Sequence, residues 1–174
     1  NGQVSDIVIK GLTVKQLIEN GDFGDGFNLW DTSSSSLVYE INNNIAKITR
    51  IEGEENPYIS LLRSSASLFV PGHKYYTKYL VRTLDDGATS IRVQYAGVIR
   101  AVINNPQKNV WYEVGHIYES DAPRRQGVIV DFDNALNKSI EVAYMMRIDL
   151  TANGLEDKTV EELNKMFPHY LKYG

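Results

Sequence analysis

Residues 17–30 read Leu-Ile-Glu-Asn-Gly-Asp-Phe-Gly-Asp-Gly-Phe-Asn-Leu-Trp and combine two local signals. Apolar residues open the stretch, and a run of Asn, Gly and Asp follows, which is the composition of a tight turn next to a strand. The stretch therefore predicts a β-strand that leads into a Gly-rich turn. Because this strand starts at Leu17 and no Met opens the chain, we interpret residues 1–16 as the tail end of a preceding segment of a longer protein.

Most of the remaining chain alternates apolar and polar residues with a period of two, as strands do when they bury one face in an antiparallel sheet. In residues 75–83, for example, Tyr79 and Val81 share one predicted face. Lys78 and Arg82 share the other. Nine short strands are expected, over residues 37–41, 45–50, 58–62, 75–83, 91–95, 98–103, 110–119, 127–132 and 140–150.

The last of these strands shows the clearest alternation. One predicted face carries Ile140, Val142, Tyr144, Met146, Ile148 and Leu150, and the other carries Glu141, Ala143, Met145, Arg147 and Asp149. Helix signals occur in one place, where residues 159–162 (Thr-Val-Glu-Glu) form a capping box. The helix that follows is expected to end at Pro168 and to dock an apolar stripe, made by Val160, Leu163 and Phe167, on the sheets or on a neighbouring module.

Composition excludes several classes of function. The chain has 174 residues, 43% of them hydrophobic, which is enough for one domain with a substantial core. It has no cysteine, so disulfides, thiolate metal sites and a Cys nucleophile are excluded. The net charge of −4 and the lack of a basic run argue against a nucleic-acid partner. Apolar runs are too short for a membrane helix.

Catalytic motifs are also missing. Four carboxylates lie on predicted strands, at Glu113, Asp131, Asp133 and Glu141, but their spacing singles out no acid and base pair for glycoside hydrolysis. The three histidines are scattered, and no nucleophile elbow, zinc-binding helix or phosphate loop occurs. We therefore expect that the protein is not an enzyme.

Several motifs occur in the order typical of one family. They are residues 17–30, residues 70–75 (Val-Pro-Gly-His-Lys-Tyr), the strand that contains Trp111, residues 132–134 (Phe-Asp-Asn) and residues 146–151 (Met-Arg-Ile-Asp-Leu-Thr). Together they resemble galactose-binding-like carbohydrate-binding modules. The resemblance implies an all-β, antiparallel jelly-roll β-sandwich with a short C-terminal helix. It divides the chain into an extension (1–16), the jelly roll (17–152) and a C-terminal turn and helix (153–174).

The C-terminal end adds a narrower resemblance. Residues 148–152 (Ile-Asp-Leu-Thr-Ala), a Gly-bearing turn and residues 159–167 are similar to the end of such modules in phage tail and baseplate proteins of Gram-positive hosts. This implies a non-catalytic module of a phage or prophage tail protein, located on the virion or outside cells, that attaches to host cell-surface or cell-wall carbohydrate and contacts other tail or baseplate subunits. The alternatives are a structural tail module with no sugar ligand, and an accessory targeting module of a larger glycan-active enzyme.

Sugar sites on β-sandwiches pair an aromatic face with planar polar side chains that bind neighbouring hydroxyls. If the strands that carry them are adjacent, the candidates that line one groove are Tyr76, Arg82, Arg92 and Gln94. Otherwise they belong to an ordinary solvated face. Trp111 and Glu113 join this set if Tyr112 and Val114 face inward. The opposite parity buries Trp111 in the core.

Two further sites follow from the resemblance. Such jelly rolls bind sugar either in a groove or at a loop tip, and the tip here is residues 52–58, which also suit a plain solvated loop. The resemblance also implies a structural calcium ion between the first and last strands, where Asn20, Asp22 and Asp149 are the oxygen donors. The alternative for the Asp22 region is a simple turn. Trp30 is expected to be structural.

Overall fold

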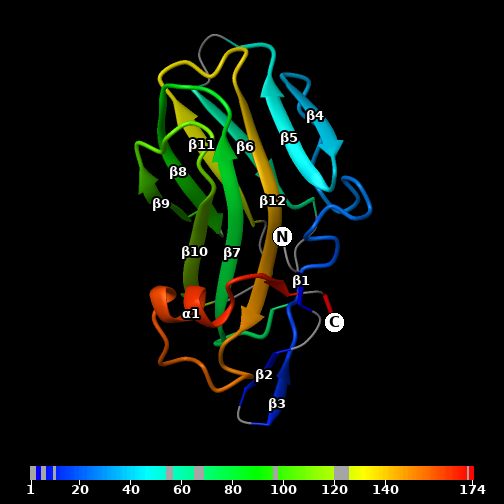
Figure 1. The fold of residues 1–174 in the computed structure, drawn as a ribbon, viewed down its shortest axis with the longest axis vertical. Helices are drawn as coiled ribbons and strands as arrows, with labels where there is room; N and C mark the ends of the chain where they lie inside the picture. Colours follow the sequence, from blue (N-terminus) through cyan, green and yellow to red (C-terminus); the bar gives the residue numbers. More distant parts are fainter. Residues whose placement is uncertain are drawn as a thin grey trace.

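The protein, seen here as a computed structural model, folds as two antiparallel sheets that face each other (Figure 1). The structure describes residues 3–4, 7–9, 11–53, 57–64, 69–95, 98–119, 126–171 and 173–174. The five-stranded sheet has the order β10 (Tyr112–Glu119), β7 (Lys74–Thr83), β12 (Ser139–Asp149), β5 (Ile45–Arg50), β4 (Leu37–Asn42). The four-stranded sheet has the order β6 (Tyr58–Leu62), β11 (Gln126–Phe132), β8 (Ala88–Tyr95), β9 (Val98–Asn104). The predicted jelly-roll β-sandwich is confirmed, and all nine expected strands form.

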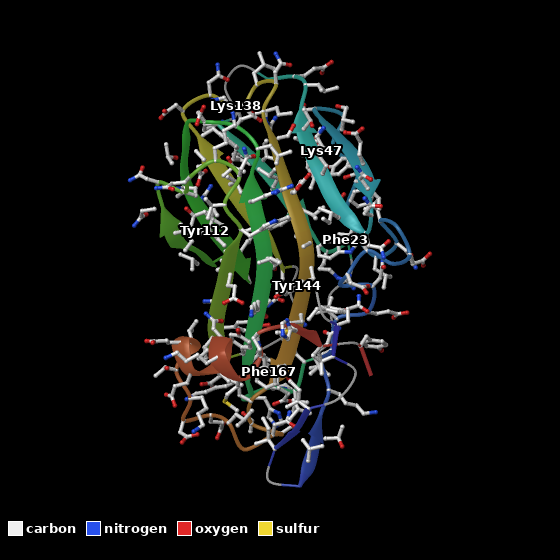
Figure 2. The ribbon with its side chains drawn as sticks, in the orientation of Figure 1. Phe23, Lys47, Tyr112, Lys138, Tyr144 and Phe167 are labelled. Atoms are coloured by element: carbon white, nitrogen blue, oxygen red, sulfur yellow. The ribbon has the colours of Figure 1, made fainter. Side chains whose placement is uncertain are left out.

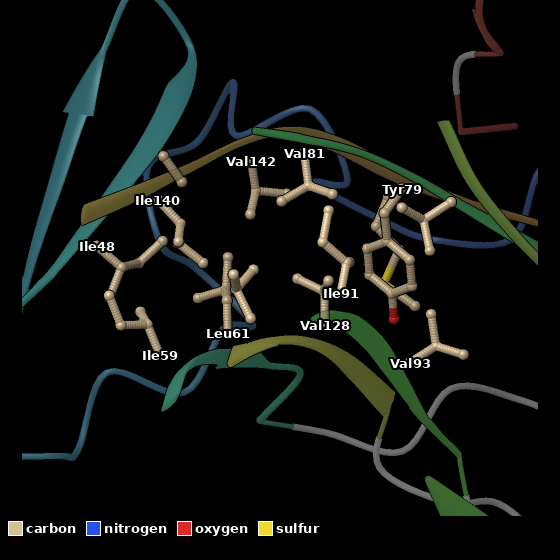
Figure 3. Packing of buried hydrophobic residues seen from close by; sticks show 14 of the residues in the cluster. Ile48, Ile59, Leu61, Tyr79, Val81, Ile91, Val93, Val128, Ile140 and Val142 are labelled. Carbon is tan, nitrogen blue, oxygen red and sulfur yellow. The ribbon is translucent and has the colours of Figure 1, made fainter. Parts of the chain in front are cut away.

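The main core lies between the two sheets, where apolar side chains of each inner face interdigitate (Figure 3). Ile48, Val81 and Val142 of the five-stranded sheet and Leu61 and Ile91 of the other are fully buried. Burying each such side chain stabilises the fold by roughly 1.5–3 kcal/mol. Burial of one face of each strand between the two sheets therefore explains the alternation of apolar and polar residues in the sequence.

A second apolar cluster covers half of the outer face of the five-stranded sheet. It is made where α1 (Val160–Met166), β13 (Tyr170–Leu171) and β1 (Gln3–Val4) cross the strands, with the hairpin of β2 (Ile7–Ile9) and β3 (Leu12–Val14) below them (Figure 1). We call α1, β13 and β1 the terminal strap, because β1 pairs in parallel with β13 and joins the two ends of the chain. The described part of residues 1–16 thus packs against the sandwich.

The helix forms as expected. Thr159 and Glu162 make the reciprocal capping box, and Leu163 and Phe167 are fully buried against the sheet. The apolar stripe therefore docks on the sandwich itself, which decides between the two alternatives left by the sequence.

Strand β12 differs from the prediction, because its outer and inner residues change places midway. A β-bulge between Val142 and Tyr144 shifts the register against β7, so that Val142 and Met145 face the main core while Ala143 and Tyr144 both face outward. A bulge adds one residue and thereby switches the side-chain parity. The first part of the predicted apolar face packs in the main core, and the rest packs in the second apolar cluster on the opposite side of the sheet. The sequence pattern shows these two sets as one continuous face.

The opening segment, residues 17–30, contains no strand, which corrects the expectation of a first strand there. It lies against the edge of β12 through two backbone hydrogen bonds, from Leu17 N to the Arg147 carbonyl (2.8 Å) and from Met145 N to the Gly21 carbonyl (2.8 Å). Trp30 is structural as predicted. Its ring stacks on Phe23 at 4.8 Å and is 4% exposed.

Arg147 gives a stability prediction. Its side chain is fully buried, its guanidinium lies 4.5 Å from the Phe69 ring, and none of its three nitrogens has a hydrogen-bond partner in the described structure. An unpaired buried charge costs more than a hydrophobe of similar volume. We expect Arg147→Met to raise the free energy of unfolding by about 1–3 kcal/mol in urea denaturation. A loss of more than about 1 kcal/mol would mean that the guanidinium is paired in solution.

Candidate functional site

One pocket lies on the outer face of the five-stranded sheet, where the uncovered half of that face meets the terminal strap. Its volume is about 310 Å³, at the lower end of the range for small-ligand sites. Figure 2 shows Tyr144 at this boundary, between Lys47 on the open half and Phe167 under the strap. The described residues that line it are Gln3, Asp22, Asn43, Asn44, Ile45, Leu80, Glu113, Ala143, Tyr144, Pro168, His169 and Tyr170.

The sheet supplies the floor of this pocket. Leu80 comes from β7, and the bulge in β12 turns both Ala143 and Tyr144 toward the pocket. The ring of Tyr144 packs against that of Tyr170, with centroids 5.4 Å apart, so two aromatic rings meet in one site. Apolar and aromatic surface of this kind is what covers the C–H face of a sugar ring.

The terminal strap supplies one wall. Pro168 stops α1, and residues 168–170 then run along the floor into β13. Lys78 fixes this wall from below, because its fully buried ammonium donates to the Phe167 carbonyl at 2.7 Å and to Glu113 Oε1 at 2.7 Å. Burial lowers the pKa of Lys78, and the bond to Glu113 opposes that shift.

Planar polar groups surround the apolar floor. Asn43 and Asn44 form the turn between β4 and β5 and adopt positive φ angles of 51° and 58°. Asp22 accepts a hydrogen bond of 2.8 Å from the amide of Gln3. Amides and carboxylates are planar groups that can bind neighbouring hydroxyls in two-pronged fashion. The pocket therefore combines both chemical elements of a saccharide site.

Four of the predicted ligand residues lie on this outer face. Glu113 lines the pocket, and Arg82 lies beside it with its guanidinium 4.5 Å from the Trp111 ring and an ion pair of 2.6 Å to Glu141. Trp111 faces outward, because Tyr112 and Val114 pack toward the main core. Tyr76 is fully buried beneath α1 and its hydroxyl donates to Asn164, so the strap separates it from solvent.

Arg92 and Gln94 lie elsewhere, and the expectation of a single groove with Arg82 is wrong. They belong to β8 in the four-stranded sheet, whereas Arg82 belongs to β7 in the five-stranded sheet. The chain crosses from one sheet to the other between β7 and β8. On its own sheet Arg92 makes a bidentate pair with Asp131, at 2.5 and 2.7 Å.

The three predicted calcium donors do not converge. The Asn20 amide nitrogen donates to the carbonyls of Asp25, Gly26 and Asn28, so a side-chain donor already occupies the place that a cation would take among these oxygens. Asp149 bonds to His73 at 2.8 Å, apart from the Asp22–Gln3 pair. No cluster of three His, Asp or Glu suited to a metal occurs within the described ranges. Calcium binding stays a prediction.

The predicted loop-tip site lies partly outside the described residues, because residues 54–56 are not described. Its last residue, Tyr58, lines a second pocket of about 240 Å³ between the edges of the two sheets. The guanidinium of Arg50 lies 5.5 Å from the Tyr58 ring, and serines dominate the rest of the lining. This pocket has less apolar surface than the first, although Tyr39 and Tyr58 both line it.

Sequence reasoning missed most of the pocket. The alternation predicts Tyr144 and Ala143 on opposite faces of the strand, because nothing in it marks the bulge. Tyr170 and His169 follow the helix in a segment without a periodic signal. Asn43 and Asn44 are residues typical of turns, and only the fold reveals that their turn borders a pocket.

Alkaline pH should destabilise the protein through four buried tyrosines, Tyr76, Tyr79, Tyr144 and Tyr170. Burial raises the pKa of each phenol above its ordinary value of 10.0. The unfolded chain therefore loses these protons first, and stability that is complete below pH 10 falls above it by up to about 1.4 kcal/mol per tyrosine per pH unit. Burial also lowers the pKa of Lys78 and of Arg63, which acts in the opposite direction, but these are two groups against four.

Circular dichroism melts from about pH 8 to about pH 11 test this, with phenolate absorbance recorded in parallel. We expect the melting temperature to fall steeply above pH 10, and the part of the phenolate absorbance that belongs to the four buried tyrosines to appear only with unfolding. Titration of all 11 phenols in a protein that stays folded would contradict it.

Comparisons with known proteins agree with the fold. No protein-family model matches the chain. No curated protein matches it either. Among solved structures it is similar to a family 16 carbohydrate-binding module-2 (TM-score 0.52, 13% identity, 76% of this chain and 99% of that one). It is also similar to TmCBM61 in complex with beta-1,4-galactotriose (TM-score 0.51, 12% identity, 78% and 99%).

A third similar structure is longer. It contains the CBM22-1 and GH10 modules of a Clostridium thermocellum endo-1,4-beta-D-xylanase 10B complexed with xylohexaose (TM-score 0.57, 10% identity, 80% of this chain and 29% of that one). At these identities the likeness establishes the jelly-roll fold alone. Within the described residues, no helix has the length and apolar character needed to cross a membrane.

Proposed function

We propose that the chain is a non-catalytic carbohydrate-binding module and that its ligand site is the pocket beside the terminal strap. The observation that carries this proposal is the composition of that pocket. Tyr144 and Tyr170 supply aromatic surface, while Asn43, Asp22 and Glu113 supply planar hydrogen-bonding groups around it. The structural similarity to carbohydrate-binding modules supports the same ligand class.

The carboxylates support a binding role over a catalytic one. Three of the four acidic candidates are held by cations, since Glu113 pairs with Lys78, Glu141 with Arg82 and Asp131 with Arg92. Asp131 also belongs to the other sheet from Glu113. A glycosidase needs two carboxyl groups that converge on one bond.

For the setting we propose a phage or prophage tail protein that attaches to host cell-surface saccharide, with other tail or baseplate subunits as partners. The support is the resemblance of residues 148–167. Repetition of a weak site around a multimeric tail would supply avidity through effective concentration. An accessory targeting module of a glycan-active enzyme is the second candidate, and the xylanase structure with its linked CBM22-1 and GH10 modules favours it.

A glycan array followed by titration calorimetry tests the proposal. The array should include galacto-, manno-, xylo- and gluco-oligosaccharides together with cell-wall polysaccharide of Gram-positive bacteria. We expect at least one saccharide class to bind with a Kd between about 1 μM and about 1 mM. Failure of a folded protein to bind any of them would leave the structural-module alternative as the better account.

A further inference from the structure

The pocket is elongated across the strands, and its two ends differ. Its floor takes residues in turn from four neighbouring strands: Glu113 of β10, Leu80 of β7, Ala143 and Tyr144 of β12, and Ile45 of β5. Adjacent strands lie about 4.8 Å apart, so the floor extends roughly 14 Å. The strap runs along it, across β7 and β12 (Figure 1).

The end beyond β12 is closed by the two termini of the chain and the opening segment. Tyr170 of the strap pairs with Gln3 of β1, and the Gln3 amide donates to Asp22 at 2.8 Å. The residue before Asp22, Gly21, accepts a backbone hydrogen bond from Met145 of β12. These contacts form a continuous chain from the strap to the edge of β12.

The turn between β4 and β5 stands next to this barrier. Residue Asn43 and its neighbour Asn44 both line the pocket, and Ile45 continues from them into the floor. We call Gln3, Asp22, Asn43 and Asn44 the closed end. All four side chains carry groups that can bind hydroxyls, so this end offers polar partners on more than one side.

The opposite end is open. β10 is the edge strand of the five-stranded sheet, and Glu113, the pocket residue that it contributes, has a side chain that is 42% exposed. A ligand that extends past Glu113 therefore meets solvent, whereas one that extends past Asp22 meets the hydrogen-bonded Gln3–Asp22 pair.

We propose that the pocket binds the terminal unit of a saccharide chain at its closed end, with the rest of the chain leaving over β10. This inference rests on the proposed carbohydrate-binding function and adds the substrate class, chain ends rather than internal segments. A chain that continued in both directions would have to pass through the Gln3–Asp22 contact.

The test uses the oligosaccharide class that binds best in the array, as a series from disaccharide to hexasaccharide in titration calorimetry. One hexasaccharide sample carries a bulky group at its reducing end and another carries it at the non-reducing end. We expect Kd to change by less than about twofold from trisaccharide to hexasaccharide, and one of the two blocked chains to bind at least about tenfold more weakly. In Gln3→Ala, which opens the closed end, that blocked chain should regain affinity.

Two results separate the inference from the function on which it rests. Affinity that rises more than about tenfold from trisaccharide to hexasaccharide, with both blocked chains bound equally, would overturn end recognition and leave saccharide binding intact. Absence of binding by every oligosaccharide would overturn both.

Discussion

Gly21→Ala is expected to destabilise the protein by about 3 kcal/mol. A Cβ at this position would lie 2.1 Å from the backbone carbonyl of Met145, far inside van der Waals contact. The clash cannot be relieved by a side-chain rotation, because the opposing atom belongs to β12. The backbone bond between Met145 N and the Gly21 carbonyl must then lengthen or break, and the opening segment must shift.

Gly24→Ala is the matched control in the same segment. There the nearest atom to an added Cβ is Asp22 Oδ1 at 3.4 Å, an ordinary contact. We expect its free energy of unfolding, measured by urea denaturation, to stay within about 0.5 kcal/mol of the wild type. Equal stability of the two variants would show that the opening segment is not held against β12 as described.

Ala143→Trp is expected to weaken saccharide binding by at least about 100-fold, or about 2.8 kcal/mol. Ala143 lies on the floor and faces outward because of the bulge. An indole there would fill much of a pocket of about 310 Å³ without touching the main core. Calorimetry with the best oligosaccharide measures the loss, and a thermal melt checks that the protein remains folded.

Ala152→Trp is the matched control, because it makes the same substitution at a residue outside the pocket. Ala152 is exposed in the turn after β12 and does not line the pocket. Its binding should match the wild type. If Ala143→Trp bound normally while Arg92→Ala lost affinity, the site would lie on the four-stranded sheet, which carries Arg92.

The sandwich could be predicted from the sequence because each strand carries its own local signal. Tyr79 and Val81 share one face of their strand, and both are buried in the main core as the period of two predicts. The parity of Trp111 and Glu113 follows from the same rule once Val114 is placed in the core. Which strands become neighbours is a non-local property, so Arg82 and Arg92 looked adjacent although they occupy different sheets.

The pocket could not be predicted for related reasons. The bulge that turns Ala143 outward depends on the register between β12 and β7, which no single strand encodes. The closed end needs Gln3 and Tyr170, near opposite ends of the chain, to meet in one pair of strands. Short strands of two residues give no periodicity to detect.

Chemical-shift mapping by NMR, with the best-binding oligosaccharide titrated into the labelled protein, tests the central claim most directly. The account predicts shifts that concentrate on Leu80, Ala143, Tyr144 and Tyr170, with Gln94 of the four-stranded sheet unchanged. Shifts that concentrate on β8 around Gln94, or around Tyr58 at the second pocket, would contradict the claim that the saccharide binds beside the terminal strap.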